Sequence, residues 1–115
     1  MDDVVAIDAL AAKAGIPVIY DGAHAFGSTV NGQSVFAFGD ISTCSFHATK
    51  IFHMVEGGGI FANDPDTLKK SSWMRNFGHN GPGVYAGIGI NGKNSEMHAA
   101  MGLANLNHID HVLSR

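Results

Sequence analysis

The alternation of apolar and polar positions predicts a helix followed by a strand at the start of the chain. Asp2–Ala14 carries apolar side chains at near-helical spacing, and Gly15 after it is a typical helix stop. The next run, Ile16–Tyr20, is short, apolar and β-branched, which is typical of a strand buried on both faces of a parallel sheet. Such a strand delivers Asp21 at its carboxyl end, where open α/β sheets bind ligands.

Two more strands and a second helix are predicted further along the chain. Ile41–Ser45 and Gly59–Ala62 have the composition of strands, and the segment up to Lys50 leaves the first of them. Asp64 followed by Pro65 is typical of a helix N-cap with proline at the first helical position, so a helix is expected from there to about Arg75.

The last third of the chain is predicted to be a loop and then a helix. Asn76–Lys93 contains six glycines and has no clear period, which indicates an irregular loop. A helix is expected from Ser95 or Glu96 onward. Its apolar stripe would consist of Met97, Ala100, Met101 and Ala104.

A lysine and an aspartate on neighbouring strand ends carry the main chemical signal. Lys50 follows Asp21 by 29 residues and closes the stretch Ser45–Lys50 (SFHATK). A lysine amine can condense with the aldehyde of pyridoxal 5′-phosphate (PLP), while a carboxylate keeps the pyridine nitrogen protonated so that the ring acts as an electron sink. The pair therefore predicts a PLP site in which Lys50 holds the cofactor and Asp21 tunes it.

Simpler roles remain open for the same side chains. A lysine at a strand-to-loop junction is normally a solvated surface charge. Asp21 and Ser45 could serve local turns, and His24 could donate to a nearby carbonyl. Asn91 lies among glycines, where asparagine commonly adopts a left-handed conformation. A cofactor site is favoured because these residues occur together and in this order.

Composition and charge narrow the class of protein. The chain has 115 residues, 45% of them hydrophobic and 15% charged, which fits a globular unit of single-domain size. Its net charge is −3 and it has no basic run, so nothing indicates nucleic-acid or membrane partners. With no apolar stretch of membrane-spanning length, a cytoplasmic protein is expected. Cys44 is the single cysteine, which excludes an internal disulfide and a thiolate metal cluster.

Two other motifs are weaker. Gly87–Gly92 fits the G-x-G-x-x-G pattern of dinucleotide-binding proteins, but no complete βαβ unit fits around it. His108 and His111 can meet on one helix face, yet with Asp110 nearby they do not make a full ligand set, so no metal site is predicted.

From about Ile16 to His108 the chain resembles the DegT/DnrJ/EryC1/StrS family of PLP-dependent sugar aminotransferases. The resemblance rests on the order and spacing of the motifs around Asp21, Lys50 and Asn91, and on Glu56–Gly59 (EGGG), which is similar to the turn that follows the family's lysine. It implies the following roles: Asp21 on the pyridinium nitrogen, His24 on the phenolic oxygen, Ser45 on the phosphate, Lys50 as the Schiff-base lysine, and Asn91 reaching the cofactor phosphate of a neighbouring subunit.

The resemblance also implies a fold and a reaction. The fold is an α/β, fold-type I (aspartate aminotransferase-like) large domain with a mostly parallel sheet flanked by helices. The reaction is transamination of a nucleotide-linked keto-sugar with glutamate as the amino donor, in a homodimer. Arg75–Gly78 and Gly89–Lys93 look most like members that aminate C4 of a dTDP-4-keto-6-deoxyhexose, while C3 amination and inositol or other ketose acceptors stay open. Candidate sugar or diphosphate contacts are His79, Asn80 and Lys93.

Family members are several times longer than this chain. Residues 1–115 are therefore expected to be part of the PLP-binding large domain, without its upstream portion and without the small C-terminal domain. A truncated, non-catalytic remnant of such an enzyme is the alternative hypothesis, and a small binding module of unrelated purpose is another.

Overall fold

A computed structural model describes residues 3–115, and its first element is the predicted helix. Helix α1 spans Val4–Ala14. Its N-cap is Asp3, whose carboxylate accepts the Ala6 N–H at 3.1 Å. Gly15 ends the helix in the left-handed conformation, with φ of 65°, as predicted. The expected start at Asp2 lies outside the described residues.

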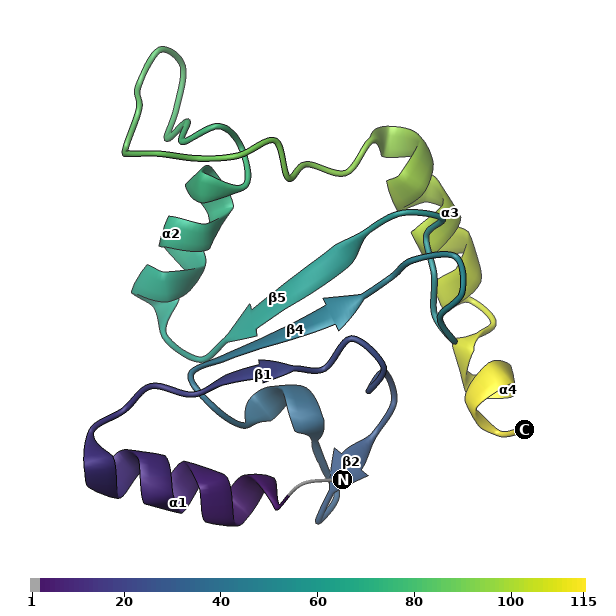
Figure 1. Cartoon of the computed structure of the whole chain (residues 1–115). Helices are drawn as coiled ribbons and strands as arrows, with labels where there is room; N and C mark the ends of the chain where they lie inside the picture. Colours follow the sequence, from purple (N-terminus) through teal and green to yellow (C-terminus); the bar gives the residue numbers. More distant parts are fainter. Residues whose placement is uncertain (1–2) are drawn as a thin grey trace.

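The central sheet has the strand order β1-β4-β5 (Figure 1). Strand β1 is Ile19–Asp21 and β4 is Ile41–Ser45, and the two are parallel, with Asp21 paired to Thr43. Parallel neighbours need a connection of a dozen or more residues. Here that connection contains a small antiparallel hairpin, β2 (Thr29–Val30) and β3 (Gln33–Ser34), followed by the 3₁₀ helix η1, Val35–Ala37.

Strand β1 is shorter and more exposed than predicted. It begins at Ile19 instead of Ile16, because the Val18 N–H is taken by the Asp40 carboxylate at 2.7 Å and does not enter the ladder. Ile19 is 66% exposed, so the prediction that both faces of this strand are buried is wrong for the chain as described. Ile19 and Asp21 point to the same face of the sheet and both are exposed, so the described residues do not cover that face of β1.

Strand β5, Gly58–Ala62, corrects a second prediction. It pairs antiparallel with β4, from Ile41 opposite Ala62 to Ser45 opposite Gly58. The α/β class is confirmed, but of the two pairings in this sheet only β1–β4 is parallel. The reason is the connection over residues 46–57, which contains no helix and turns back on itself, whereas a parallel strand would require a crossover.

Helix α2 follows β5 closely and begins where the sequence predicts. It spans Pro65–Met74, with Asp64 as N-cap and Arg75 as C-cap. The Asp64 carboxylate accepts hydrogen bonds from the Thr67 backbone N–H and hydroxyl, and the hydroxyl bond is the main cause of the lowered pKa of this carboxyl. The residues from Asn76 to Lys93 form the expected irregular loop.

The final helical segment differs from its prediction in continuity and in the face it buries. It is divided into α3, Glu96–Leu106, and α4, Ile109–Leu113. The buried residue of α3 is Gly102. The predicted apolar stripe of α3 is exposed instead: Met97, Ala100, Met101 and Ala104.

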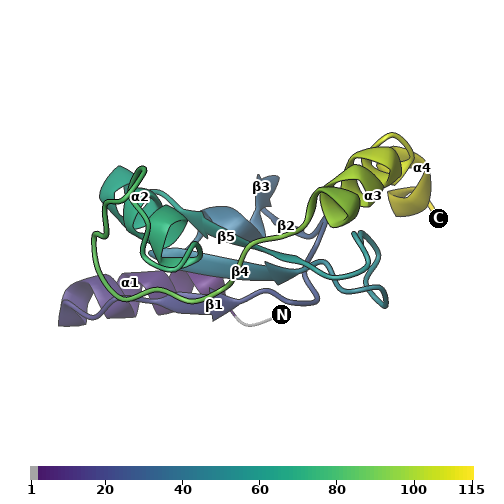
Figure 2. The same cartoon turned by 90° about the horizontal axis from the view of Figure 1, so that it is seen from above.

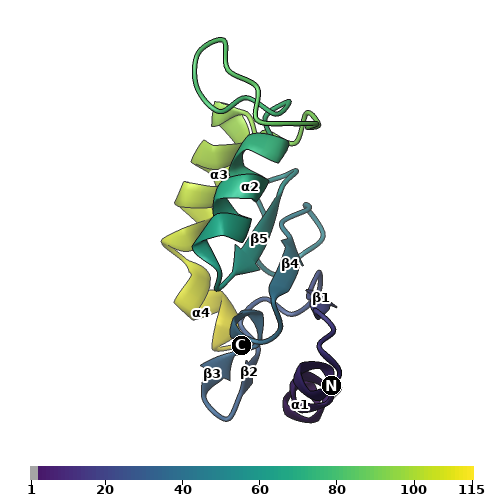
Figure 3. The same ribbon diagram turned by 90° about the vertical axis from the view of Figure 1, so that its left-hand side faces the viewer.

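The molecule is flat, and its core is small. Its principal extents are 44 × 40 × 19 Å, and its radius of gyration is 15.9 Å, against about 13 Å for a compact domain of this length. Helix α1 lies next to β1 and α2 next to β5 (Figure 3), while α3 and α4 lie beyond the carboxyl end of β4 (Figure 2). The buried apolar side chains are Val4, Cys44, Phe52 and Met54. Among residues 3–115, no helix combines the length and the apolar character needed to cross a bilayer.

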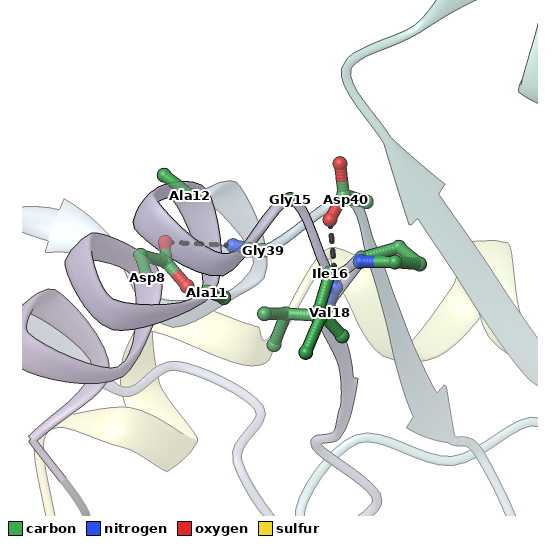
Figure 4. Close-up of a pocket in the computed structure, with 9 residues that line it drawn as sticks. Asp8, Ala11, Ala12, Gly15, Ile16, Val18, Gly39 and Asp40 are labelled. Atoms are coloured by element: carbon green, nitrogen blue, oxygen red, sulfur yellow. Dashed lines mark hydrogen bonds between the residues drawn. The ribbon is translucent and has the colours of Figure 1, made fainter.

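Helix α1 is attached to the sheet largely by polar contacts around a cavity of about 510 Å³ (Figure 4). The Asp8 carboxylate accepts the Tyr20 hydroxyl at 2.8 Å and the Gly39 N–H at 3.0 Å. The Tyr20 hydroxyl also lies 3.2 Å from the Val4 carbonyl oxygen. Of the apolar side chains of this helix Val4 is buried, whereas Leu10 is 68% exposed, so these polar contacts add to an apolar contact that is limited to one end of the helix.

Replacing Asp8 is expected to loosen α1. Asp8→Ala removes two part-buried hydrogen bonds, so the free energy of unfolding in urea should fall by about 2 kcal/mol, at about 1 kcal/mol for each bond. Tyr20→Phe removes the hydroxyl, and with it the bond to this carboxylate and the contact with the Val4 carbonyl, but it leaves the Gly39 bond in place, so it should cost less than Asp8→Ala. A loss below about 0.5 kcal/mol for Asp8→Ala would contradict this attachment.

Candidate functional site

Asp21 and Ser45 lie on one face of the sheet, at the carboxyl ends of two parallel strands. Asp21 is in register with Thr43, and paired residues of neighbouring strands point to the same side of a sheet. Ser45 is two residues beyond Thr43 and therefore shares that side. The opposite side carries the buried Ser42 and Cys44. The strand pairing thus places a carboxylate and a hydroxyl together at one edge, as the sequence predicts.

Lys50 comes to this edge on a tight turn after β4. Its backbone N–H donates to the His47 carbonyl at 2.9 Å. Its Nζ lies 3.1 Å from Nε2 and 3.4 Å from Nδ1 of the His24 ring. A small cavity of about 130 Å³ is bordered by both residues and by Thr49. Lys50 is half-buried, so its amine is held in place and can still be reached from solvent.

An aromatic cluster supports the segment on which Lys50 lies. The rings of Phe26 and Phe52 stack with centroids 4.9 Å apart, and Phe46 meets Phe52 edge-on at 5.1 Å. Helix α3 closes the far side, because Gly102 brings its backbone against Met54 and leaves no room for a larger side chain without displacement. The Lys50 turn is therefore anchored on both sides by packing.

Asn105 adds a polar link between α3 and the same segment. Its side-chain amide donates to the His53 carbonyl at 2.8 Å. The bond is part-buried and joins residues 52 positions apart in the chain. It fixes the relative position of the helix and the Lys50 segment.

The simpler roles considered for Asp21 and Ser45 are present in the structure. Asp21 Oδ1 accepts the Ala23 N–H at 3.0 Å, and Ser45 Oγ accepts the His47 N–H at 3.3 Å. Each contact occupies one acceptor site, and a carboxylate has about four. The Asp21 carboxylate is also exposed. Both groups consequently retain capacity for a ligand while they shape their turns.

The charge of Lys50 affects the pKa of the Cys44 thiol, which lies on the other face of β4. Burial raises the pKa of the Cys44 thiol, and the positive charge of Lys50 partly opposes that rise. Cys44 is 4% exposed, and its thiol donates to the Ser45 carbonyl at 3.8 Å. The thiol pKa therefore depends on the charge at Lys50, although the Cys44 side chain points to the face opposite Asp21 and Ser45.

The four candidate residues of the long loop form a separate group. Lys93 donates to Asn91 Oδ1 at 2.9 Å, and its Nζ lies 4.1 Å from the centre of the Phe77 ring. The His79 ring lies 4.5 Å from that of Tyr85, while the Asn80 N–H donates to the Val84 carbonyl at 2.9 Å.

The tip of this loop lies beyond α2, and its last part returns to α3 (Figure 1), where the Asn94 side-chain amide lies 3.8 Å from Met54 Sδ. Among residues 3–115, no hydrogen bond or ring contact joins its candidates to those around Lys50.

The glycines of the Gly87–Gly92 pattern have a steric reason in this loop. A Cβ on Gly78 would overlap the Gly87 carbonyl oxygen, and a Cβ on Gly89 would overlap the Gly78 nitrogen. Gly87 lies against the Trp73 ring, at 3.0 Å from the position its Cβ would take. The pattern lies between two helices, not between a strand and a helix, so it lacks the setting of a dinucleotide site.

Sequence reasoning did not single out His47, whose ring and backbone both take part in the Lys50 turn. The ring Nδ1 accepts the Thr49 N–H at 3.3 Å and lies 3.0 Å from the Thr49 hydroxyl. Nε2 lies 3.6 Å from Glu56 Oε1. The available signal was its place inside the Ser45–Lys50 motif, with a threonine two positions on and a carboxylate nearby in the chain.

The groups at the sheet edge fit the requirements of PLP. The cofactor needs an amine for its aldehyde, a carboxylate for its ring nitrogen and donors for its phosphate. Asp21 supplies an exposed carboxylate and Ser45 a hydroxyl at neighbouring strand ends, and Lys50 supplies an accessible amine on the turn after β4. No part of this donor set conflicts with the group.

Comparisons with known proteins show the family of this chain. Residues 1–115 match the DegT/DnrJ/EryC1/StrS aminotransferase family. A dTDP-4-amino-4,6-dideoxy-D-glucose transaminase of Shigella dysenteriae is 45% identical over 111 residues, which are 96% of this chain and 30% of that protein. The chain therefore spans about a third of the length of this curated relative.

Solved structures share the fold. DesI, solved in the presence of its TDP-sugar product, matches with a TM-score of 0.86 and 34% identity, over 96% of this chain and 28% of that one. The PLP form of a putative sugar aminotransferase from Streptococcus pneumoniae matches with a TM-score of 0.73 and 28% identity, over 84% of this chain and 26% of that one.

Removing the Lys50 charge is expected to make Cys44 less reactive. In Lys50→Met the opposing positive charge is gone, so the thiol pKa should rise further and alkylation by iodoacetamide near pH 9 should slow by about two- to fivefold. Lys13→Met, which removes an exposed charge on α1, is the matched control and should leave the rate unchanged. Equal rates for Lys50→Met and the unmodified protein would contradict the electrostatic coupling.

Proposed function

Because this chain belongs to the DegT/DnrJ/EryC1/StrS aminotransferase family, we propose that it carries the lysine-bearing part of a PLP-dependent aminotransferase acting on a nucleotide-linked keto-sugar. The observation that carries the proposal is the placement of Asp21, Ser45 and the Lys50 turn at one sheet edge. Residues 1–115 would then form part of the PLP-binding large domain of a cytoplasmic enzyme.

Each residue of the site would have a distinct task. Lys50 would hold the cofactor covalently, Asp21 would face its ring nitrogen, Ser45 would donate to its phosphate and His24 would contact its phenolic oxygen. When bound, PLP supplies an aldehyde that condenses with amines and a ring that takes up the electron pair released at the donor's α-carbon. Released from the cofactor, the Lys50 amine would move a proton at that carbon.

The substrate class is proposed from the relatives. The Shigella relative is named for a dTDP-linked 4-amino-4,6-dideoxy sugar, and DesI was solved with a TDP-sugar product. We therefore favour amination at C4 of a dTDP-4-keto-6-deoxyhexose, with glutamate as the donor. His79, Asn80 and Lys93 would contact the sugar or diphosphate.

Asn91 would act from a second subunit. It is exposed, and its side-chain oxygen accepts from Lys93 instead of contacting the groups around Lys50, which leaves it accessible to a cofactor phosphate across an interface. A homodimer of the whole protein is part of the proposal for that reason.

The first test is a covalent adduct at Lys50. Incubation with PLP should give an absorbance band at about 410–430 nm, the usual range for a PLP–lysine adduct, and borohydride should fix the cofactor on Lys50, as located by peptide mass spectrometry. Lys50→Ala should lose both signals, whereas Lys13→Ala should keep them. An adduct spread over several lysines, or none on folded protein, would contradict the proposed site.

Asp21→Asn distinguishes the effect of the Asp21 charge on the cofactor's ring nitrogen from the structural role of Asp21 in its turn. The amide oxygen can still accept the Ala23 N–H, so the turn and the Lys50 adduct should survive, but the negative charge on the ring nitrogen is lost. Exchange of the α-proton of glutamate into deuterated water should therefore fall by about 100-fold or more. Exchange that stays at the unmodified rate, with the adduct intact, would remove Asp21 from the proposed chemistry.

A further inference from the structure

His47 lies at the centre of the turn that carries Lys50. Its backbone N–H donates to Ser45 Oγ at 3.3 Å, and its carbonyl accepts the Lys50 N–H at 2.9 Å. Its ring accepts the Thr49 N–H at 3.3 Å. The residue is thus hydrogen-bonded both to the hydroxyl assigned to the phosphate and to the backbone of the lysine.

The His47 ring also contacts Glu56, at the other end of the segment over residues 46–57. Nε2 lies 3.6 Å from Glu56 Oε1, just before β5 begins at Gly58. The segment over residues 46–57 leaves β4 and returns to it as β5, so this contact spans its two arms. Phe46 N–H donates to the Gly57 carbonyl at 2.9 Å and closes the base of the same segment.

We propose that His47 is a positioning residue, which fixes the Lys50 turn relative to Ser45 by linking the Thr49 backbone to the Glu56 carboxylate. The inference rests on the proposed function, because it concerns where a cofactor held by Lys50 and Ser45 would be placed. His47 itself touches neither the cofactor nor a substrate in this assignment.

The hydrogen bonds determine the tautomer of the His47 ring. A backbone N–H is always a donor, so Nδ1 must be the unprotonated nitrogen that accepts from Thr49. The ring proton is then on Nε2, which lies 3.6 Å from Glu56 Oε1. The bond at Nδ1 and the contact at Nε2 together restrict the orientation of the ring.

The effect should fall on positioning more than on stability. The His47 and Glu56 side chains are 46% and 66% exposed, and exposed pairs of this kind contribute little to folding. Their geometric effect is larger, because covalent capture by Lys50 requires the amine and the Ser45 hydroxyl to be in place together. Loss of the ring should therefore slow capture while the aromatic cluster keeps the chain folded.

Three variants test the assignment. His47→Asn keeps an acceptor for the N–H two residues on, as in an Asx turn, but does not extend to Glu56. His47→Ala removes the acceptor and the link, and Glu56→Gln keeps an acceptor for Nε2–H without the charge. Together they separate the contribution of the Nδ1 bond to the Thr49 N–H from that of the Nε2 contact with Glu56.

The first readout uses the cofactor-free chain. Hydrogen exchange of the Thr49 amide should be about five- to tenfold faster in His47→Ala and near the unmodified rate in His47→Asn, which is the range expected for one modest hydrogen bond. The ¹⁵N shifts of the His47 ring should show Nε2 protonated. A ring protonated on Nδ1, or Thr49 exchange that is unchanged in His47→Ala, overturns the proposal.

The second readout is the rate at which borohydride traps PLP on Lys50. It should fall by about five- to tenfold in His47→Ala, recover at least halfway in His47→Asn, and fall by about two- to threefold in Glu56→Gln. If His47→Asn traps PLP no faster than His47→Ala, the positioning role is overturned. If the unmodified chain traps no PLP, the proposed function fails, and with it the role toward a cofactor, while the exchange and tautomer measurements still decide whether the ring holds the turn.

Discussion

The parallel pairing of β1 with β4 is the constraint on which the site depends. Because the two strands run in the same direction, their carboxyl ends meet at one edge, and the register of Asp21 with Thr43 puts Asp21 and Ser45 on one face. A shift of register by one residue would send one of these side chains to the face that carries Cys44. The placement of Asp21 beside Ser45 therefore follows from a backbone ladder of three residue pairs.

Packing around Lys50 complements that ladder. The three phenylalanine rings below the turn, and α3 held against Met54 by a glycine, restrict where residues 46–57 can lie. Polar contacts then select the orientation of individual groups: His24 beside the Lys50 amine and His47 across the turn. Apolar contacts thus fix the position of residues 46–57, and hydrogen bonds orient individual side chains within that segment.

Much of this arrangement could be predicted from sequence because its signals are local. The Asp64–Pro65 cap, the Gly15 stop and the strand over residues 41–45 all depend on neighbouring residues, and all three are confirmed. The missed hairpin also had a local signal: Asn31 and Gly32, with φ of 52° and 78°, form the two-residue turn that such a pair favours.

The failures concern partners distant in the chain. The direction of β5, the exposure of Ile19 and the face buried by α3 depend on which element lies opposite, and periodicity alone does not contain that information. For the site, order and spacing were enough to bring Asp21, Ser45 and Lys50 together. Contacts such as that of His47 with Glu56 depend on how the segment closes and could not be derived from spacing.

The exposed edges of the sheet have a consequence for how the chain behaves in solution. Strand β1 lies at one edge with Ile19 uncovered, and β5 lies at the other with Ile60 51% exposed. Unpaired backbone groups beside apolar side chains are a template for strand addition. Self-association should therefore increase with protein concentration and compete with folding, so handling this polypeptide as a monomer calls for dilute conditions or a companion segment that caps those edges.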